Sequence, residues 1–343
     1  MKKKGPSIKD IAKALNVSIT TVSFVLNGKA KERRISEAVT KKILDYAKKI
    51  NYTPNHLARS LRTGESKTLV FMVEDISNNY FFARVARIIE DIAHEHGYMV
   101  IFCSNDNDDD KSTELINMFT HGQIDGYIVI PSAGIKDQIQ NLINDDIPVV
   151  LFDRHFPELD CNYVIINNEE AVYSGTKHLH DNGYKNIGFI TVDLKQSQMQ
   201  DRLLGYKKAA KDLGQEAAIL EIPYDEKWTN KGIQLMVEFI KNNPQLDSLF
   251  FSTNYLTVQG LTVFKEYFPD ELHQMGLLSF DDIDLFKVCT PSISAVAQPL
   301  DQIAEALMKI ILDQLNKDKE VTGFQKIVLN SELHVRESSK RKD

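Results

Sequence analysis

The residues near the N-terminus that best suit specific polar contacts lie on the outer face of a short helix predicted to begin after Ser18. That face carries hydroxyl and amide side chains and one branched apolar side chain, namely Ile19, Thr20, Thr21, Ser23 and Asn27. Short hydroxyl and amide groups suit the base edges and phosphates of DNA better than they suit a protein core. This face therefore predicts recognition of nucleic acid.

A second set of polar side chains stands just after predicted buried strands, or in the helix that follows one. Its members are Asp153, Arg202, Asn254 and Asp281. Ligands of parallel α/β sheets bind outside the carboxyl ends of the strands, which predicts a common cleft. The planar Arg202 guanidinium suits bidentate pairing to vicinal sugar hydroxyls or a carboxylate, and Asp281 can accept from hydroxyls opposite it. The alternative is a salt bridge between two lobes, which is compatible with ligand binding across open and closed states.

Three short helices are predicted to position the first set. Ser7, Ser18 and Ser36 are the predicted N-caps of the three helices. A tight turn at Asn16 joins the first two helices, and Gly28 ends the second. Two helices joined by so short a turn, with a third behind them, are typical of the helix-turn-helix unit.

The charge of the 343-residue chain is strongly polarised. Residues 1–66 hold 15 Lys and Arg against 5 Asp and Glu, a net of +10. The other 277 residues hold 26 against 43, a net of -17, which leaves the whole chain at -7. An acidic protein with a small basic head predicts a polyanionic partner at that head alone. A solvated basic tail is the alternative, but the predicted helices disfavour it.

Several segments of the first 62 residues closely resemble the lactose/galactose-repressor (LacI/GalR) family of bacterial transcription regulators. They are the run Ser7–Ser23, Leu26-Asn27-Gly28, Arg34-Ile35-Ser36, Asn51-Tyr52-Thr53-Pro54-Asn55 and Leu57-Ala58-Arg59-Ser60-Leu61-Arg62. The resemblance extends to about Arg336. It implies an all-α helix-turn-helix head, a hinge helix, and an α/β two-lobed periplasmic-binding-protein-like body with doubly wound parallel sheets.

The resemblance also implies that the head and hinge bind operator DNA. The positions that match the family's DNA contacts are Ser7, Ser18, Ile19, Thr20, Thr21, Ser23, Phe24, Asn27, Asn51, Tyr52, Asn55, Leu57, Ala58, Leu61 and Arg62. Because the hinge is barely two turns long, we expect it to order only on DNA and beside its twin from a second subunit. In the family, the leucine matching Leu61 is wedged into the minor groove and bends the duplex. Docking of Leu57 and Leu61 on the body is the alternative.

From Thr68 onward, short apolar runs alternate with amphipathic helices, which predicts doubly wound parallel sheets. The predicted buried strands are Leu69–Val73, Met99–Cys103, Tyr127–Ile130, Val149–Phe152, Ile187–Thr191, Ile219–Ile222, Leu249–Ser252, Leu277–Phe280 and Ile293–Ala297. The alternation restarts near Ile187, which predicts two lobes. The expected domains are residues 1–53 (head), 54–66 (hinge and linker) and 67–343 (body). Within the body, we expect one lobe at about 67–166 plus 297–325 and the other at about 167–296 plus 326–337.

The resemblance implies that a small molecule, a sugar or sugar derivative, binds between the lobes and controls operator affinity. The positions that match effector contacts are Phe81, Asp153, Gln198, Arg202, Trp228, Asn254 and Asp281. The face of Trp228 suits stacking on a sugar ring. This chain departs from the family where Asn78-Asn79-Tyr80-Phe81-Phe82 replaces Asn-Pro-Phe-Phe and where Tyr255 replaces a common Asp.

Enzymatic functions find no support in the sequence, which lacks the motifs of nucleotide-binding, hydrolase and zinc-protease sites. The cysteines, Cys103, Cys161 and Cys289, predict neither a disulfide framework nor a zinc knuckle. We therefore expect a repressor rather than an enzyme, with no cofactor and no metal. The alternative is a soluble sugar-binding protein or an enzyme on the same body with an incidental basic head. An uptake protein would need export, and no apolar segment of a signal peptide follows Lys4.

We expect this repressor to be cytoplasmic and associated with the nucleoid. Its expected partners are pseudopalindromic operator DNA, a small-molecule effector and a second copy of the chain, with no membrane. A second copy is expected because one head contacts only a few base pairs.

Overall fold

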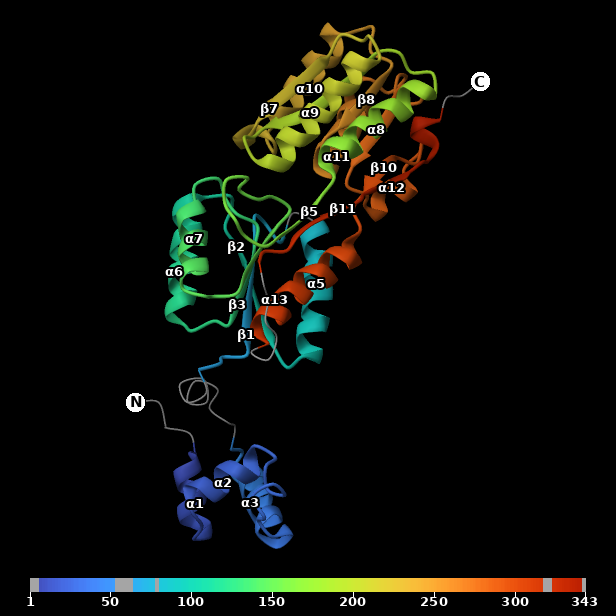
Figure 1. Ribbon diagram of the computed structural model, residues 1–343. Helices are drawn as coiled ribbons and strands as arrows, with labels where there is room; N and C mark the ends of the chain where they lie inside the picture. The colour runs from blue at the N-terminus through green and yellow to red at the C-terminus, as the bar shows by residue number, and fades with distance from the viewer. Residues whose placement is uncertain (1–5, 53–63, 78–79, 317–322, 341–343) are drawn as a thin grey trace. The chain divides into compact units, whose positions relative to one another are not determined.

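The computed structural model describes residues 6–52, 64–77, 80–316 and 323–340. The chain divides into two compact units, Met1–Ser66 and Lys67–Asp343, which are called the head and the body below (Figure 1). Among the described residues, no helix has the length and apolar character needed to cross a membrane.

The head is built from the three helices that the sequence predicts: α1 (Ile8–Leu15), α2 (Ile19–Leu26) and α3 (Glu37–Lys49). Ile11, Val22 and Ile43, one from each helix, are fully buried at the centre of its core. Because each helix contributes only a narrow apolar face, none can bury that face without the other two.

Polar caps fix where the helices of the head begin and end. Ser7 and Asp10 form a reciprocal capping box at the start of α1. Asn16 has a left-handed backbone with φ of 52° and ends α1, which allows α2 to begin only three residues later. Gly28, with φ of 73°, follows α2 in a conformation that suits glycine. The predicted caps and turns of the head are therefore confirmed.

The first lobe of the body contains a six-stranded parallel sheet in the order β11-β5-β4-β3-β1-β2. Its strands are β1 (Thr68–Val73), β2 (Met99–Ser104), β3 (Gly126–Val129), β4 (Val149–Phe152), β5 (Tyr163–Ile166) and β11 (Lys326–Leu329). The helices are α5 (Tyr80–Glu95), α6 (Asp109–His121), α7 (Lys136–Asn144) and α13 (Leu300–Leu315). Figure 1 shows α6 and α7 on one face of the sheet and α5 with α13 on the other.

The second lobe repeats this plan with the strand order β12-β10-β9-β8-β6-β7. Its strands are β6 (Ile187–Asp193), β7 (Ala218–Pro223), β8 (Ser248–Phe251), β9 (Gly276–Phe280), β10 (Ser294–Ala297) and the antiparallel β12 (Glu332–His334). The helices are α8 (Asn168–Asp181), α9 (Ser197–Asp212), α10 (Asn230–Asn242), α11 (Asn254–Tyr267) and α12 (Asp284–Val288). Short 3-10 turns lie at Tyr224–Glu226 and Glu337–Ser339.

Strand pairing corrects one expected lobe boundary. We expected residues 326–337 to belong to the second lobe, but β11 pairs in parallel with β5 of the first sheet. Only β12 joins the second sheet, beside β10. The chain therefore crosses between the lobes for the last time between Leu329 and Glu332. The two residues that connect β11 to β12 allow these consecutive short strands to join different sheets.

Two strands expected to be buried, Met99–Cys103 and Ile219–Ile222, are the edge strands β2 and β7. Most of their side chains are half-buried or exposed, and Met99 keeps 59% of its surface exposed. An edge strand has a partner on one side only, so apolar content alone does not show burial. The strands β5, β11 and β12 were not among the nine predicted.

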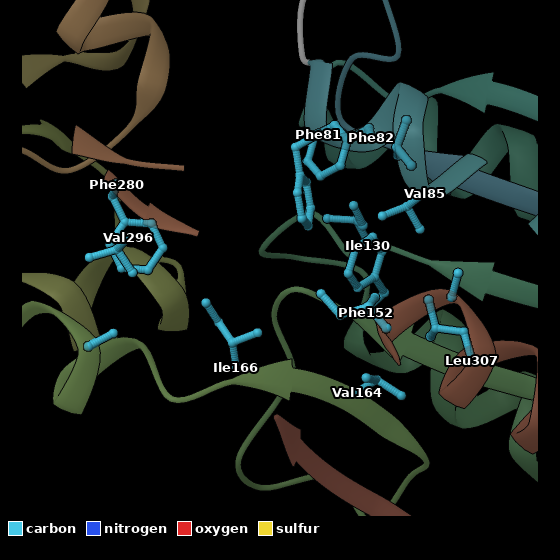
Figure 2. Packing of buried hydrophobic residues seen from close by; sticks show 14 of the residues in the cluster. Phe81, Phe82, Val85, Ile130, Phe152, Val164, Ile166, Phe280, Val296 and Leu307 are labelled. Atoms are coloured by element: carbon cyan, nitrogen blue, oxygen red, sulfur yellow. The ribbon is translucent and has the colours of Figure 1, made fainter. Parts of the chain in front are cut away.

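A continuous apolar core fixes the first lobe and reaches into the second (Figure 2). The side chains of Phe81, Phe82 and Phe152 pack against one another, with ring centres 5.3 to 6.3 Å apart. Ile166 follows at the end of β5, and Phe280 lies in the second lobe. The aromatic cluster therefore sits beside the ends of the strands that carry the predicted cleft residues.

The contact between α8 and α9 yields a test of the packing. A Cβ atom added at Gly205 of α9 would lie 2.2 Å from the backbone oxygen of Glu169 in α8. Backbone cannot retreat as a flexible side chain can, so Gly205→Ala should lower the free energy of unfolding by about 3 kcal/mol, the upper end of the usual range for overpacking. Urea unfolding measures this. Leu204→Ala, at the exposed neighbouring position, is the control and should change stability far less.

Candidate DNA-binding face and effector cleft

The outer face of α2 combines exposed side chains with hydroxyls already used as caps. Ile19 and Thr20 are exposed in the first turn of the helix. The Ser18 hydroxyl accepts from the Thr21 backbone N–H at 2.9 Å and lies 2.7 Å from the Thr21 hydroxyl. Asn27 donates to the backbone oxygen of Ser23 at 2.7 Å. Ser18 and Asn27 therefore hold the ends of α2, and Ile19 and Thr20 are exposed on its first turn.

Phe24 has a role that the sequence does not indicate. The Arg33 guanidinium carbon lies 4.9 Å from the centre of the half-buried Phe24 ring. A cation over an aromatic face is attracted by the ring's quadrupole. Phe24 therefore supports an exposed cation beside α2, and Arg33 joins the candidate DNA-facing residues.

The remaining predicted DNA contacts fall into two groups. Ser7 caps α1, and half-buried Tyr52 packs on the head core, where burial raises the pKa of its hydroxyl. Asn51 is exposed with a left-handed backbone of φ 49°. The predicted hinge contacts lie outside the described residues: Asn55, Leu57, Ala58, Leu61 and Arg62.

In the body, side chains from both lobes enclose a small cavity of about 50 Å³. The predicted effector residues that line this inner cavity are Phe81, Asp153, Gln198, Arg202 and Asp281. The lining that was not predicted is Glu74, Phe82, Arg154, Leu194, Met199, Thr253, Tyr255 and Gln298. This volume has room for a few water molecules but not for a sugar ring.

Arg202 is anchored entirely within the second lobe. Its Nε donates to Asn168 Oδ1 and its Nη1 donates to the Ser252 carbonyl, both at 2.8 Å. The guanidinium carbon lies 3.6 Å from the centre of the Phe280 ring. Asp281 Oδ2 is 3.8 Å from Nη1 and is also in the second lobe. The alternative of a salt bridge between lobes is therefore wrong for this pair.

Asp153 and Asp281 are buried acids that terminate one strand in each lobe. Both have left-handed backbones, with φ of 66° and 68°, directly after β4 and β9. Burial raises the pKa of Asp153 to about 6, against the opposing attraction of Arg154 and Arg202. Burial also raises the pKa of Asp281, partly offset by Arg202 and by a 2.6 Å hydrogen bond from Gln298. Each acid is thus poised to gain from a hydroxyl donor.

Trp228 and Asn254 do not line the inner cavity. Trp228, 54% exposed, lines an outer cavity of about 260 Å³, and its ring centre lies 4.9 Å from that of Tyr255. Asn254 is buried in the first turn of α11, between Thr253 and Tyr255, which face the inner cavity instead. Side chains of neighbouring residues in a helix point about 100° apart. The rule that ligands bind at the carboxyl ends of the strands does not tell which of these side chains faces the cavity.

The polar contacts that join the lobes were missed by sequence reasoning. Glu74, after β1, accepts from Arg154 of its own lobe at 2.6 Å and from the Tyr224 hydroxyl of the second lobe at 2.7 Å. Asn107 accepts from Arg154 at 2.8 Å and from Gln196 of the second lobe. The sequence could have indicated Glu74 as a cleft residue, because Glu74 directly follows a buried strand as Asp153 and Asp281 do.

Two buried polar atoms in the inner cavity have no hydrogen-bond partner among the described residues. They are Oε1 of Gln198 and Nε of Arg154, one acceptor and one donor. Buried polar atoms are nearly always satisfied, so these two are available to a ligand or to water. In the described ranges no cluster of three His, Cys, Asp or Glu side chains suits a metal ion.

Comparison with known proteins places this architecture in a family. Residues 7–55 match the model of "Bacterial regulatory proteins, lacI family", and residues 66–329 match "Periplasmic binding proteins and sugar binding domain of LacI family". The chain belongs to the LacI family of transcriptional regulators. The expected fold class and regulatory function are therefore confirmed, and the alternative of a soluble sugar-binding protein or an enzyme with an incidental basic head is not favoured.

Individual relatives agree with this assignment. The ribose operon repressor of Haemophilus influenzae is 30% identical and is matched over 97% of this chain and 98% of its own. The structure of the lac repressor dimer bound to operator and an anti-inducer is 18% identical, covers 98% of this chain and all of its own, and superposes with a TM-score of 0.83. A LacI regulator of Alkaliphilus metalliredigens complexed with D-xylulofuranose is 21% identical, covers 79% and 98% of the two chains, and has a TM-score of 0.69.

The raised pKa of Asp153 predicts a pH-dependent stability. A carboxyl with a pKa near 6 when folded and 3.8 when unfolded binds more protons in the folded state between those values. The parent should therefore gain stability relative to Asp153→Asn as the pH falls from about 7 to about 4. Urea unfolding of both chains across this range measures the difference. A difference that does not vary with pH would contradict a raised pKa at Asp153.

Proposed function

We propose that this protein is a homodimeric repressor that binds a pseudopalindromic operator and is controlled by a sugar, or a derivative of one, bound between the lobes. It acts on DNA in the cytoplasm. Gln198 Oε1 and Arg154 Nε, which have no hydrogen-bond partner among the described residues and lie beside Asp153, Arg202 and Asp281, carry the effector part of the proposal. Carboxylates, an amide oxygen and a guanidinium together match a ring of hydroxyls, each of which both donates and accepts.

The head supports DNA binding through its charge and its shape. A net charge of +10 in residues 1–66 favours a polyanion, and the exposed Ile19 and Thr20 on α2 suit base edges. Ile19 can contact thymine methyl groups, and Arg33, held over Phe24, adds a phosphate contact.

Two exposed apolar sites on the body support a homodimer. Met99 and Ile101 point outward from the edge strand β2, and Val288 on α12 is 77% exposed beside exposed Leu285. Large apolar side chains gathered on a surface mark contact with another protein, and an edge strand readily meets its own copy.

Closure of the cleft provides the switch. A ligand shifts an equilibrium only by its difference in affinity for the two states. An effector that contacts Asp153 in the first lobe and Arg202 in the second is bound fully only when the lobes approach. The first lobe is continuous in sequence with the hinge, so its position carries the response to DNA. Typical couplings of about 1–3 kcal/mol change operator affinity about 5- to 150-fold.

Selection of bound sequences from a pool of random duplexes tests the DNA-binding part. The selected sequences should converge on a pseudopalindrome with two half-sites, because a dimer presents two heads. The affinity of the selected duplex should fall with salt at a log–log slope of about -0.9 per phosphate neutralised. A single half-site in the consensus, or an affinity that does not change with salt, would refute the proposal.

Substitution of Gln198 tests the effector site with little risk to the fold. Its Oε1 has no hydrogen-bond partner among the described residues, so Gln198→Ala removes an acceptor open to a ligand without breaking a described contact of that atom. Operator affinity without effector should stay unchanged, while the effector concentration needed for half response should rise about 2- to 10-fold. Operator titrations with a panel of neutral sugars measure both quantities. Gln234→Ala, at an exposed glutamine of α10 that lines neither cavity, is the matched control and should respond as the parent does.

A further inference from the structure

The Glu74 carboxylate lies where three donors converge. Its Oε2 accepts from Arg154 Nη2 at 2.6 Å, and its Oε1 accepts from the Tyr224 hydroxyl at 2.7 Å. Lys227 Nζ lies 3.5 Å from Oε1. Two cations and a hydroxyl around one pair of oxygens form the arrangement by which proteins bind a phosphate or carboxylate group. Here the anion belongs to the chain itself.

Glu74 also stands between the two cavities of the cleft. It lines the inner cavity of about 50 Å³ and the outer cavity of about 260 Å³, as do Phe82 and Tyr255. An anionic group on a ligand can pair with Arg154 and Lys227 only by displacing the Glu74 carboxylate. In the inner cavity it would also meet Asp153 and Asp281, and like charges brought together strongly disfavour binding.

We propose that Glu74 is a built-in anion that reserves the cleft for uncharged, hydroxylated effectors and excludes phosphorylated or carboxylated ones. This inference rests on the proposed effector site and names the chemical class of its ligand. With Glu74 paired to Arg154 Nη2 and Lys227, the groups of the inner cavity left to a ligand are mainly acceptors, beside the donor Nε of Arg154. Asp153, Asp281 and Gln198 Oε1 each accept a hydrogen bond, which a neutral hydroxyl donates and the dianion of a phosphate monoester does not.

Binding of inorganic phosphate to the full chain, without DNA or sugar, tests the inference. Calorimetric titration at neutral pH and constant ionic strength should give no saturable binding for the parent. Glu74→Gln removes the charge at nearly constant shape, and Glu74→Ala also joins the two cavities. Both variants should bind phosphate at least about tenfold more tightly than the parent, with the Ala variant tighter. Glu74→Asp keeps the charge and should behave as the parent does.

Glu226→Gln is the matched control, because it makes the same charge change in the second lobe and frees Lys231 instead of the cleft cations. It should gain no phosphate binding. Saturable binding by the parent, no gain in the Gln variant, or an equal gain in Glu226→Gln would each overturn the role of Glu74. The Gln variant decides the outcome should the Ala variant fail to fold. Failure to select an operator would refute the proposed function and leave this result unchanged.

Discussion

A guanidinium that loses its water must find acceptors inside the protein, and the cleft is arranged around two such groups. Arg154 and Arg202 are each 3% exposed. Removing an ion from water costs several kcal/mol unless hydrogen bonds and counter-charges replace the lost hydration. Each lobe satisfies its own arginine: Glu74 and Asn107 accept from Arg154, whereas carbonyl and amide oxygens of the second lobe accept from Arg202.

Contact between the lobes then uses the acceptor capacity that remains. The second oxygen of Glu74 accepts a hydrogen bond from the Tyr224 hydroxyl, and Asn107 Oδ1 also accepts one from the Gln196 amide. Opening the cleft would exchange these hydrogen bonds and the Lys227–Glu74 ion pair for water while leaving both arginines paired. A hydrogen bond exchanged for water contributes only about 0.5–1.5 kcal/mol net, so these polar contacts add little to the stability of the closed cleft. A small free-energy difference between two states allows one ligand of modest affinity to shift the population.

Much of this arrangement could be predicted from the sequence because it follows local rules. Serine caps, a left-handed Asn16 and apolar stripes determine the head, and alternating strands and helices determine the two-lobed body. The strand-end rule found Asp153 and Asp281, whose side chains enter the cleft because the chain turns sharply after β4 and β9. The same rule applied to β1 would have found Glu74.

What the sequence could not predict depends on contacts between distant segments. The local sequences of β11 and β12 do not indicate which sheet each strand joins, because this depends on pairing with the distant strands β5 and β10. Trp228 and Asn254 were placed by position along the chain, but side-chain direction at a helix start decides which cavity a residue lines. Tyr224 lies 150 residues from Glu74, so their hydrogen bond is visible only once the fold has brought them together.

The head carries a net positive charge and the body a net negative charge, which suits a DNA-binding head and a body that stays off the DNA. DNA repels the net -17 of residues 67–343 and attracts the +10 of residues 1–66, so favourable contact with the duplex is confined to the head. A ligand bound in the body therefore cannot act by adding direct contacts to DNA. Residues 53–66 are the covalent connection between α3 of the head and β1 of the first lobe. That connection leads to β1, and Glu74 directly follows β1, so one strand lies between the link to the head and a group that joins the lobes.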